Sequence, residues 1–352
     1  MNKIVQNSLF YVVVFCVTYF IYVYPFEILN ELIFNELVNR RVSFYYTIII
    51  SILIIFYFRS YASLKPLRFF VYEGMGIGFI SFWIVTIAYF SSKIILIDSQ
   101  IIGITALVII LLLSLISFYY GNKVFSKKIN LTSNKIKHDL SFVFISDIHL
   151  GSNSETHLLK IINEIKKYKI DFILIGGDLI DSSSTPIESL KHFIDFKCPI
   201  YFVTGNHEYY IKNSNSIISN LNKYNIQHIS NKSVIFNDLN LIGIDDNLSK
   251  EQQIKLLNNN LKEGNYNLLL VHKPSIWTEV NDNLDLMLSG HTHNGQIFPF
   301  NLFVRIQFKF KFGLYDNNRN SFLYVSSGSG PWGPKMRLGT FNEVILFNLS
   351  PK

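Results

Sequence analysis

The stretch FVFISDIH, residues 142–149, is a short apolar run that ends in an aspartate and a histidine two positions apart. In an extended backbone, side chains at positions i and i+2 point to the same side. Asp147 and His149 can therefore offer a carboxylate oxygen and an imidazole nitrogen to one metal ion. An Asp-X-His pair alone is more often the solvated start of a loop, so its meaning depends on what the later segments add.

Four later segments repeat the pattern, because apolar runs downstream also end in polar clusters. In chain order the clusters are Gly176-Gly177-Asp178 with Asp181, Gly205-Asn206-His207-Glu208, His272-Lys273-Pro274 and Gly290-His291-Thr292-His293. Taken singly, a Gly-Asp turn or a lone histidine is usually structural. Open α/β sheets place their sites at the carboxyl ends of strands, so five such clusters together predict one shared rim.

From residue 141 onward, short β-rich runs alternate with amphipathic helical stretches, which predicts an α/β layered domain. The predicted strands are Ser141–Ser146, Asp171–Ile175, Ile200–Thr204, Leu239–Ile244, Asn267–Val271, Leu284–Leu288, Phe322–Ser326 and Glu343–Phe347. The predicted helices are Glu155–Tyr168, Ile187–Phe196 and Ser216–Tyr224.

The residue types in the clusters suit a pair of hard divalent ions. Such ions in hydrolases are held by carboxylate, imidazole and amide oxygen ligands, with a carboxylate between them. Glycines before Asp178, Asn206 and His291 predict tight turns that aim these side chains over the strand ends. The remaining histidines lack glycine neighbours, and we expect surface or packing roles for them: His138, His157, His192 and His228.

As a set, the motifs resemble those of the calcineurin-like metallophosphoesterase superfamily. The matching series is Asp147-X-His149, Gly177-Asp178-X-X-Asp181, Gly205-Asn206-His207-Glu208, His272 and Gly290-His291-X-His293. The segments Gly290–Gln296 and Ser326–Gly339 further resemble a membrane-associated bacterial branch. The resemblance runs from about residue 141 to the C-terminus. It implies a four-layer α/β fold in which two central mixed β-sheets are flanked by helices.

The resemblance also implies roles for these side chains. It assigns Asp147, His149 and His293 to one ion, Asn206, His272 and His291 to the other, and Asp178 to the bridge between them. His207 would bind the substrate phosphate and is the candidate proton donor to the leaving oxygen, so His207, Asp178 and Asn206 are the expected catalytic residues. The two divalent ions, Mn, Zn or Fe, would lower the pKa of a bridging water and supply metal-bound hydroxide for in-line attack at phosphorus.

The chain has 352 residues and is 49% hydrophobic, and the apolar excess lies almost wholly before Gly121. Four stretches approach the length that spans a bilayer as a helix: Ser8–Tyr24, Phe44–Phe58, Phe69–Phe90 and Ile101–Tyr120. We therefore expect a bundle of about four transmembrane helices at residues 1–120, a basic linker at residues 121–140 and the metallophosphoesterase domain at residues 141–352.

Loop charges predict the orientation, because Lys and Arg are retained on the cytoplasmic side. The second loop and the segment after the fourth stretch are basic, which places both termini and the catalytic domain in the cytoplasm of a multi-pass inner-membrane protein. The inverse orientation follows if the short second stretch does not cross. The net charge of +7 fits this membrane bias, so no nucleic acid polymer is expected as a partner. The two cysteines fall in different regions, which argues against a disulfide framework or a thiolate metal site.

Two departures from the family pattern bear on the substrate. Ser182 follows Asp181 where the protein-phosphatase branch has an arginine, and Glu208 stands where many relatives have Asp. Both weaken a phosphoprotein substrate and leave monoesters, diesters and pyrophosphates open. The segment Phe298–Phe312 interleaves aromatic and basic residues. It is either a strand with Lys309 and Lys311 on its outer face or a flap that meets lipid.

Three functions remain open. The first is a membrane-anchored dinuclear phosphoesterase that hydrolyses a phosphodiester or pyrophosphate bond of a lipid-linked substrate of the nucleotide-sugar lipid type. The second is a general or nucleotide phosphodiesterase whose membrane region only fixes its location. The third is a membrane sensor or scaffold with a relic site.

Overall fold

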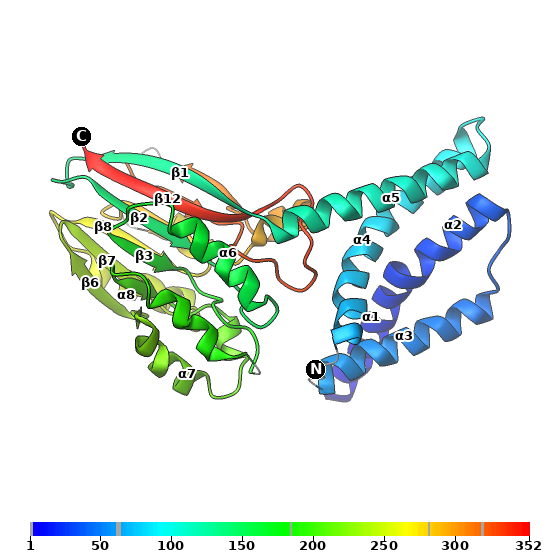
Figure 1. Ribbon diagram of the computed structural model, residues 1–352, viewed down its shortest axis with the longest axis horizontal. Coiled ribbons are helices and arrows are strands. Elements are labelled where there is room, and N and C mark those ends of the chain that lie inside the picture. The colour runs from blue at the N-terminus through cyan, green and yellow to red at the C-terminus, as the bar shows by residue number, and fades with distance from the viewer. Residues whose placement is uncertain (1–2, 61–64, 184, 281, 318–319) are drawn as a thin grey trace. The chain divides into compact units, whose positions relative to one another are not determined.

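The computed structural model describes residues 3–60, 65–183, 185–280, 282–317 and 320–352. The chain divides into two compact units (Figure 1). The helical unit comprises Met1–Tyr119 with Gly333–Met336, and the sheet unit comprises Tyr120–Trp332 with Arg337–Lys352. Each unit is described by itself below.

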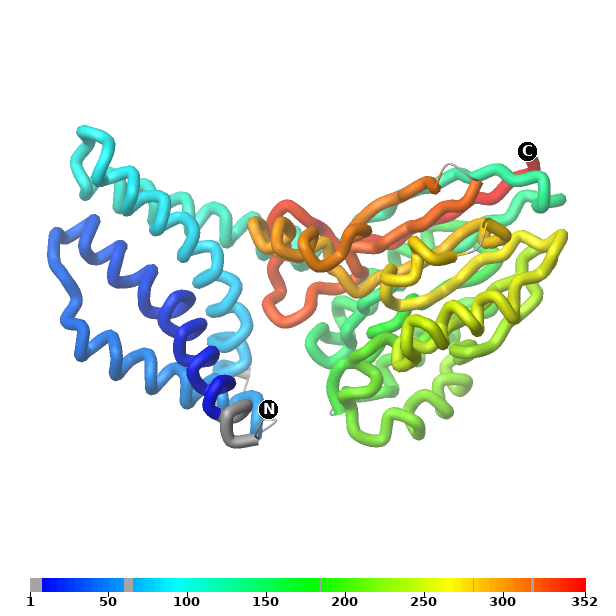
Figure 2. Tube along the Cα trace, turned by 180° about the vertical axis from the view of Figure 1, so that it is seen from behind, coloured from blue at the N-terminus to red at the C-terminus, as the bar shows by residue number. Residues whose placement is uncertain are grey.

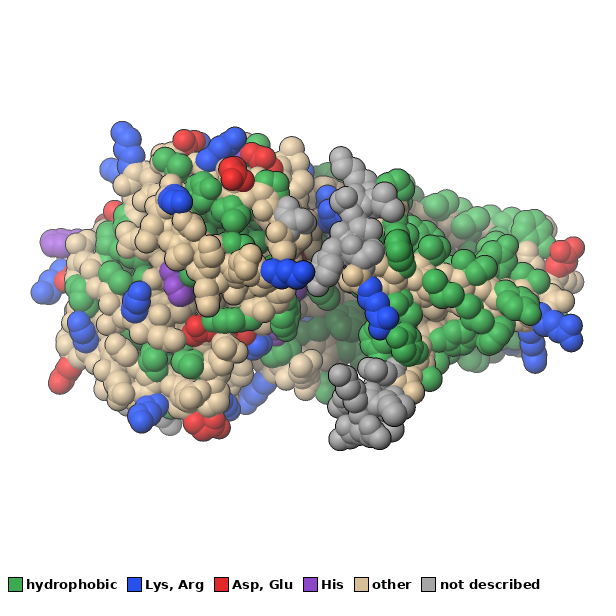
Figure 3. All heavy atoms as spheres, turned by 90° about the horizontal axis from the view of Figure 1, so that it is seen from below, with side chains coloured by type: hydrophobic (Ala, Val, Ile, Leu, Met, Phe, Trp, Pro, Cys, Tyr) green, Lys and Arg blue, Asp and Glu red, His purple; other side chains and the backbone are tan. Residues whose placement is uncertain are grey.

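The described residues include four helices that are long and apolar enough to cross a membrane, nearly all within the helical unit: Ser8–Phe34, Arg40–Arg59, Pro66–Ile94 and Ser99–Asn122. The four stretches predicted from the sequence fall within them. The second is 20 residues long, about 30 Å at the rise of an α-helix, so it is longer than predicted and matches the hydrocarbon thickness of a bilayer. Figure 3 shows hydrophobic side chains over much of the surface of this unit.

The first of these helices is a composite. It consists of α1, one π turn η1 and α2, and α2 has Pro25 in its first turn, where a backbone N–H is not needed. The bounds in the helical unit are α1 Lys3–Thr18, η1 Tyr19–Val23, α2 Tyr24–Phe34, α3 Arg40–Ser60, α4 Lys65–Ile94 and α5 Ser99–Asn122. The last three residues of α5 belong to the sheet unit.

The sheet unit begins with a six-stranded mixed sheet in the order β1-β12-β2-β3-β4-β5. Strands β2 to β5 run parallel, whereas β12 is antiparallel to β2 and parallel to β1. The bounds are β1 Val124–Ser133, β2 Leu140–Ile145, β3 Phe172–Ile175, β4 Ile200–Phe202, β5 Ile226–His228 and β12 Asn342–Pro351.

The second six-stranded sheet has the order β10-β11-β9-β8-β7-β6. Its central strands β11, β9, β8 and β7 are parallel, and both edge strands are antiparallel to their neighbours. The bounds are β6 Lys232–Phe236, β7 Leu239–Ile244, β8 Tyr266–Val271, β9 Leu286–Ser289, β10 Gly313–Asp316 and β11 Phe322–Val325.

The two sheets pack face to face over an apolar core. Phe142 of β2 stacks between Phe172 of β3 and Phe347 of β12, with ring centroids 4.8 and 5.1 Å apart. The same core includes Leu268 and Tyr324 of the second sheet. Because both faces of each sheet are covered, the central strands are apolar throughout, as is typical of buried parallel strands.

Helices cover the outer faces and complete four layers. Four buried apolar residues of α6, at helical spacing, pack on the first sheet. Helix α8 packs on the second (Figure 2). The helical bounds are α6 Glu155–Ile165, η2 Ile187–Phe193, η3 His207–Tyr209, α7 Ser214–Asn220, η4 Leu221–Tyr224, α8 Lys250–Asn260, η5 Pro274–Glu279, η6 His293–Gly295 and α9 Phe300–Gln307. The predicted fold, two mixed sheets flanked by helices, is therefore confirmed.

Two segments differ from the expectation. Residues 121–140 were expected as a linker, but Val124–Ser133 forms β1 and pairs along its whole length with β12, because Ile129 and Leu131 turn into the core. The segment Phe298–Phe312 was considered as a strand, but Phe300–Gln307 is the helix α9. Helix α8 was missed, although Ser249 and Gln252 form a capping box at its start.

Candidate metal centre

The polar clusters lie at the carboxyl ends of strands from both sheets. Asp147 and His149 follow β2, Asp178 follows β3 and Asn206 follows β4, all in the first sheet. His272 follows β8, and His291 and His293 follow β9, all in the second sheet. The site therefore forms where the ends of the two sheets meet.

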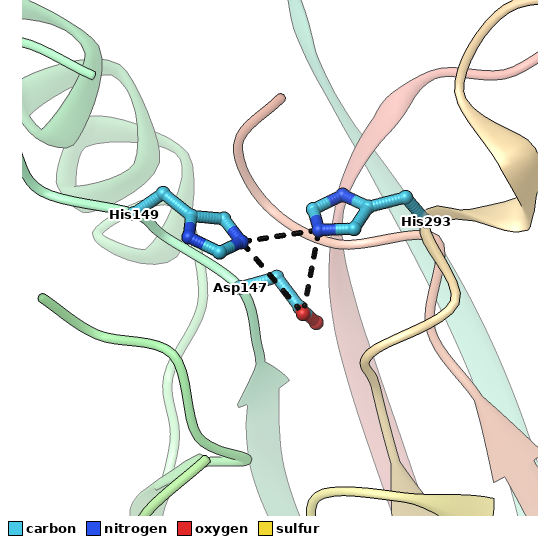
Figure 4. A group of neighbouring side chains, drawn as sticks. All are labelled: Asp147, His149 and His293. Atoms are coloured by element: carbon cyan, nitrogen blue, oxygen red, sulfur yellow. Dashed lines mark hydrogen bonds and ion pairs between the residues drawn. The ribbon is translucent and has the colours of Figure 1, made fainter. Parts of the chain in front are cut away.

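The first ligand group consists of Asp147, His149 and His293, whose donor atoms lie close enough together to hold one ion. Nε2 of His293 is 3.1 Å from Nε2 of His149 and 3.5 Å from Oδ1 of Asp147 (Figure 4). Nε2 of His149 is 4.0 Å from the same carboxylate oxygen. All three side chains point toward one another, and one comes from the opposite sheet.

The second ligand group consists of Asp178, His272 and His291. Nε2 of His272 lies 3.2 Å from Oδ2 of Asp178 and 3.2 Å from Nδ1 of His291. Oδ2 of Asp178 is also 3.9 Å from Nε2 of His149, which belongs to the first group. The Asp178 carboxylate thus stands between the two groups.

The backbone at these ligands is unusual. Five of the six residues in the two groups adopt positive φ angles: Asp147 53°, His149 50°, Asp178 51°, His291 72° and His293 48°. Left-handed backbone at a residue with a side chain costs about 1 kcal/mol or more and is concentrated at functional sites. The extended geometry expected for Asp147 and His149 is therefore wrong, although the two side chains do converge.

Two glycines are required for different reasons. Gly177 has φ 94°, and a Cβ there would lie 2.5 Å from Nδ1 of His272. At Gly290 a Cβ would lie 2.2 Å from Oδ2 of Asp147. The tight turn expected from the sequence applies to Gly177, whereas Gly290 mainly leaves room for the carboxylate of the other sheet.

The outer contacts of His272 and His149 orient their rings. Nδ1 of His272 lies 2.8 Å from the carbonyl oxygen of Gly176, and by donating its proton there it leaves the lone pair of Nε2 for an ion. Nδ1 of His149 lies 3.4 Å from Oδ2 of Asp181. Asp181 is itself fixed by the backbone N–H of Ser152 at 2.8 Å. Asp181 thus contacts the His149 ring at Nδ1, whereas Nε2 of the same ring faces the other ligands of the first group.

Arg337 lies in the segment Ser326–Gly339 that resembles the bacterial branch, but the sequence assigned no role to it, and Asn342 was not singled out. The buried Arg337 guanidinium donates to the carbonyl oxygens of His293 and Gly330, and its Nη2 lies 3.3 Å from Nδ1 of His293. Its Nε donates to Oδ1 of Asn342, whose Nδ2 donates to the carbonyl oxygens of Gly121 and Lys123. These contacts connect a ligand residue to the end of α5. The sequence signals for this pair are the motif segment that contains Arg337 and the position of Asn342 at the start of an apolar strand.

Glu208 organises the loop that carries Asp178. Its fully buried carboxylate accepts four backbone N–H groups, from Asp178, Leu179, Ile180 and Gly205. Burial and the charge of Asp178 raise the pKa of Glu208 to about 7, although the four N–H donors favour its ionised form. The GNHE motif therefore contributes a positioning residue besides the candidate ligand and the candidate acid.

The charges of the second group are strongly coupled. Burial lowers the pKa of His272, but the charges of Asp178 and Asp147 outweigh it and raise that pKa to about 10. Burial and the charge of His272 lower the pKa of His291 to about 3. Without an ion, a proton on His272 neutralises Asp178, and a bound cation would displace that proton.

Unsatisfied polar atoms test whether these residues fit metal ions. Oδ1 of Asn206 is buried and has no hydrogen-bond partner among the residues that the structure describes. Asn206 precedes His207, whose N–H donates to Oδ1 of Asp178 at 2.9 Å, so Asn206 lies beside the second group. An amide oxygen with carboxylate and imidazole donors is a set that divalent transition metals accept. The residues therefore fit metal binding.

His207 lies beside both groups and is partly exposed. Its Nε2 is 3.9 Å from Oδ2 of Asp178, and its ring centroid is 4.7 Å from that of His149. The exposed rings of Tyr210 and Trp332 flank it, with centroids at 5.4 and 5.7 Å. Burial and the charge of His149 lower the pKa of His207 to about 4. His207 is therefore neutral at pH 7.

Two of the other histidines, His157 and His192, have structural surroundings. Nε2 of the buried His157 lies 2.9 Å from the carbonyl oxygen of Ser329, and His192 pairs with Glu155 at 2.7 Å. Both lie apart from the two ligand groups. The packing and surface roles expected for these two fit their contacts.

Several proteins with similar sequences carry the name metallophosphoesterase. An uncharacterized metallophosphoesterase of Campylobacter jejuni is 34% identical over 241 residues, which cover 64% of this chain and 63% of that protein. A transmembrane protein with metallophosphoesterase domain from Bos taurus is 30% identical over 239 residues, which cover 59% of this chain and 52% of that protein. The chain thus spans less than two thirds of the length of these relatives.

Among solved structures, the phosphopantetheinyl hydrolase of Mycobacterium tuberculosis superposes with a TM-score of 0.36 and 11% identity over 56% of this chain and 94% of its own. The family model described as calcineurin-like phosphoesterase matches residues 140–295, which contain both ligand groups. With this match and the bacterial and animal relatives, the segment from residue 140 to residue 295 belongs to the calcineurin-like phosphoesterase family.

Proposed function

We propose that this chain is a membrane-anchored, dinuclear metal-dependent phosphoesterase that hydrolyses a phosphodiester or pyrophosphate bond. The observation that carries the proposal is the position of Asp178, whose Oδ2 lies 3.2 Å from Nε2 of His272 in one ligand group and 3.9 Å from Nε2 of His149 in the other. A carboxylate between two metal sites is the arrangement that two-metal hydrolases use.

The ligands divide as the family pattern implies. Asp147, His149 and His293 would hold one ion, Asn206, His272 and His291 the other, and Asp178 would bridge them. Bound divalent ions, Mn, Zn or Fe, would supply a water of lowered pKa and positive charge toward the phosphoryl oxygens.

His207 is the side chain placed to meet the substrate. It is partly exposed beside the two groups, and its low pKa makes it a neutral imidazole that donates one N–H to a phosphoryl oxygen. The negative charge of a bound phosphate would raise that pKa and favour a protonated His207, which could then pass a proton to the leaving oxygen. Its role would then be to stabilise charge and the leaving group.

The substrate we favour is lipid-linked. Four helices that can cross a membrane belong to the same chain, and the inner membrane with the catalytic domain in the cytoplasm is the location that the loop charges favour. Tyr210 and Trp332, exposed beside His207, also suit stacking on a nucleobase. A soluble nucleotide diester is therefore the second candidate.

The test is hydrolysis of bis-p-nitrophenyl phosphate with manganese by the full chain in lipid nanodiscs. His207→Ala should lower kcat by about 10²- to 10⁴-fold, the range for a lost acid–base group, and should keep its metal content. His192→Ala is the matched control, because His192 is a partly exposed histidine paired with Glu155 outside the ligand groups.

Loss of both metals in His207→Ala would show that the division of roles is wrong. The enzymatic proposal fails if the wild-type protein takes up no divalent ion, or if it takes up two ions and hydrolyses no phosphoester. The sensor or scaffold function would then remain. Competition by a lipid extract, measured against a soluble nucleotide diester, separates the two substrate candidates.

A further inference from the structure

Helix α9 exposes an apolar face. None of its eight residues, all within the described chain, is buried. At 100° per residue, Leu302, Phe303 and Ile306 fall within one arc of the helix surface. Leu302 is 54% exposed and Ile306 is 85% exposed. Burying an isoleucine or leucine side chain stabilises a folded protein by about 1.5–3 kcal/mol. Exposure of such side chains together on one face therefore indicates that a membrane or another protein covers that face.

Basic and further apolar residues adjoin this face. Phe298, just before α9, is 51% exposed, and Arg305 and Lys309 are exposed as well. An amphipathic helix with large apolar side chains on one side and basic residues beside them fits the interface between headgroups and acyl chains. The positive charges would meet anionic headgroups, whereas an apolar protein groove would leave them unpaired.

The helix is joined to the metal centre. It packs on η6, which begins with the ligand residue His293, and a Cβ at Gly295 would lie 2.3 Å from Cα of Asn301. The ring of Phe308, directly after α9, lies 5.4 Å from the ring of His291. A surface that holds α9 would therefore also hold the loop that carries two ligands of the centre.

The chain joins the sheet unit directly to a helix that can cross a membrane. Helix α5 ends at Asn122 and β1 begins at Val124, so a single residue separates a membrane-crossing helix from the first sheet. Asn342 fixes this junction through the carbonyl oxygens of Gly121 and Lys123. Because one residue joins this helix to β1, the sheet unit has a bilayer within its reach. The bilayer offers both an apolar layer and anionic headgroups, which complement the apolar and basic residues of α9.

We propose that α9 is an interfacial helix that lies on the bilayer with Leu302, Phe303 and Ile306 at the acyl boundary and Arg305 and Lys309 among the headgroups. The membrane contact stands independently of the catalytic activity. Combined with the proposed function, this contact brings the metal centre close to the lipid surface. The substrate class would then be a phosphoester of a membrane lipid.

The experiment uses the full chain, with Cys16→Ser and Cys198→Ser, in nanodiscs of phosphatidylcholine and phosphatidylglycerol. A fluorophore on Ile306→Cys is compared with one on Glu263→Cys, an exposed position that precedes β8 at the end of that strand opposite to His272. We expect doxyl-labelled lipid to quench the label at position 306 several times more strongly than the label at 263. Aqueous iodide should show the reverse order.

Equal iodide quenching at the two positions, with no quenching by lipid, would overturn the proposal. A label at 306 that is shielded from both quenchers would also overturn it, because a protein would then cover the face. Since the readout needs no turnover, a failed membrane contact and a failed phosphoesterase activity are distinguished. Unchanged metal content of Ile306→Cys shows that the variant is folded.

Discussion

The two ligand groups are built from the same residue types but are supported differently. The second group is fixed by the backbone, since His272 contacts the carbonyl oxygen of Gly176 at the end of β3. The first group depends on a side chain, the buried Arg337, which contacts His293. A contact at the end of β3 therefore fixes the second group, whereas an arginine in the loop before β12 orients the first group. We therefore expect the two ions to respond differently to single substitutions.

The largest effect should come from Asp178→Asn, which removes the feature that the groups share. The amide keeps the shape but loses the negative charge between the ions, so metal content should fall below two per chain and kcat by about 10³-fold or more. Metal analysis and hydrolysis of bis-p-nitrophenyl phosphate measure both. Retention of two ions with normal turnover would rule out the bridging role of Asp178.

Metal removal should lower the thermal stability of the sheet unit, because each group joins residues of both sheets. An ion at 100 times its dissociation constant stabilises the folded state by about 2.7 kcal/mol per site. For a unit of this size that corresponds to a melting temperature about 5–10 °C lower per lost ion.

Near-ultraviolet circular dichroism with and without a chelator measures the shift. Asp178→Asn should show a smaller shift than the wild type. An unchanged melting temperature in a wild-type protein that has lost its metal would mean that the ions do not connect the sheets.

A smaller and selective effect is expected for Arg337→Met. The carbonyl oxygens of His293 and Gly330 and Oδ1 of Asn342 would lose their donor, and the loop around His293 would relax. Loss of such an outer contact lowers metal affinity by about 10- to 100-fold, here at the first group alone. Lys255→Met, at an exposed basic residue of α8, is the control.

Stepwise metal titration should then show one weakened site and one unchanged site. Burial, the charge of His149 and the charge of Arg337 together lower the pKa of His293. The positive charge of Arg337 also repels a metal ion at the first group, which opposes the benefit of its positioning contacts. Tighter binding at one site in Arg337→Met would show that this charge outweighs the positioning contacts.

Much of the sheet unit was predictable because its strands are apolar runs that end in polar clusters. The strands β2, β3, β4, β7, β8, β9, β11 and β12 lie within one or two residues of their predicted starts. The edge strands β1, β5, β6 and β10 were missed, because edge strands are short or half exposed and carry few apolar residues. Helix α9 was missed because its apolar face is exposed.

The sequence by itself determined the family pattern, the candidate ligands and the four apolar helices, since these follow from residue types and their spacing along the chain. The tertiary structure alone decided how far the Asp178 carboxylate lies from each group, that five ligands adopt left-handed backbone, and that Arg337 and Glu208 hold the loops around them. The physical reason is that these contacts join residues of different strands and sheets. Their distances depend on how the sheets pack and not on local sequence.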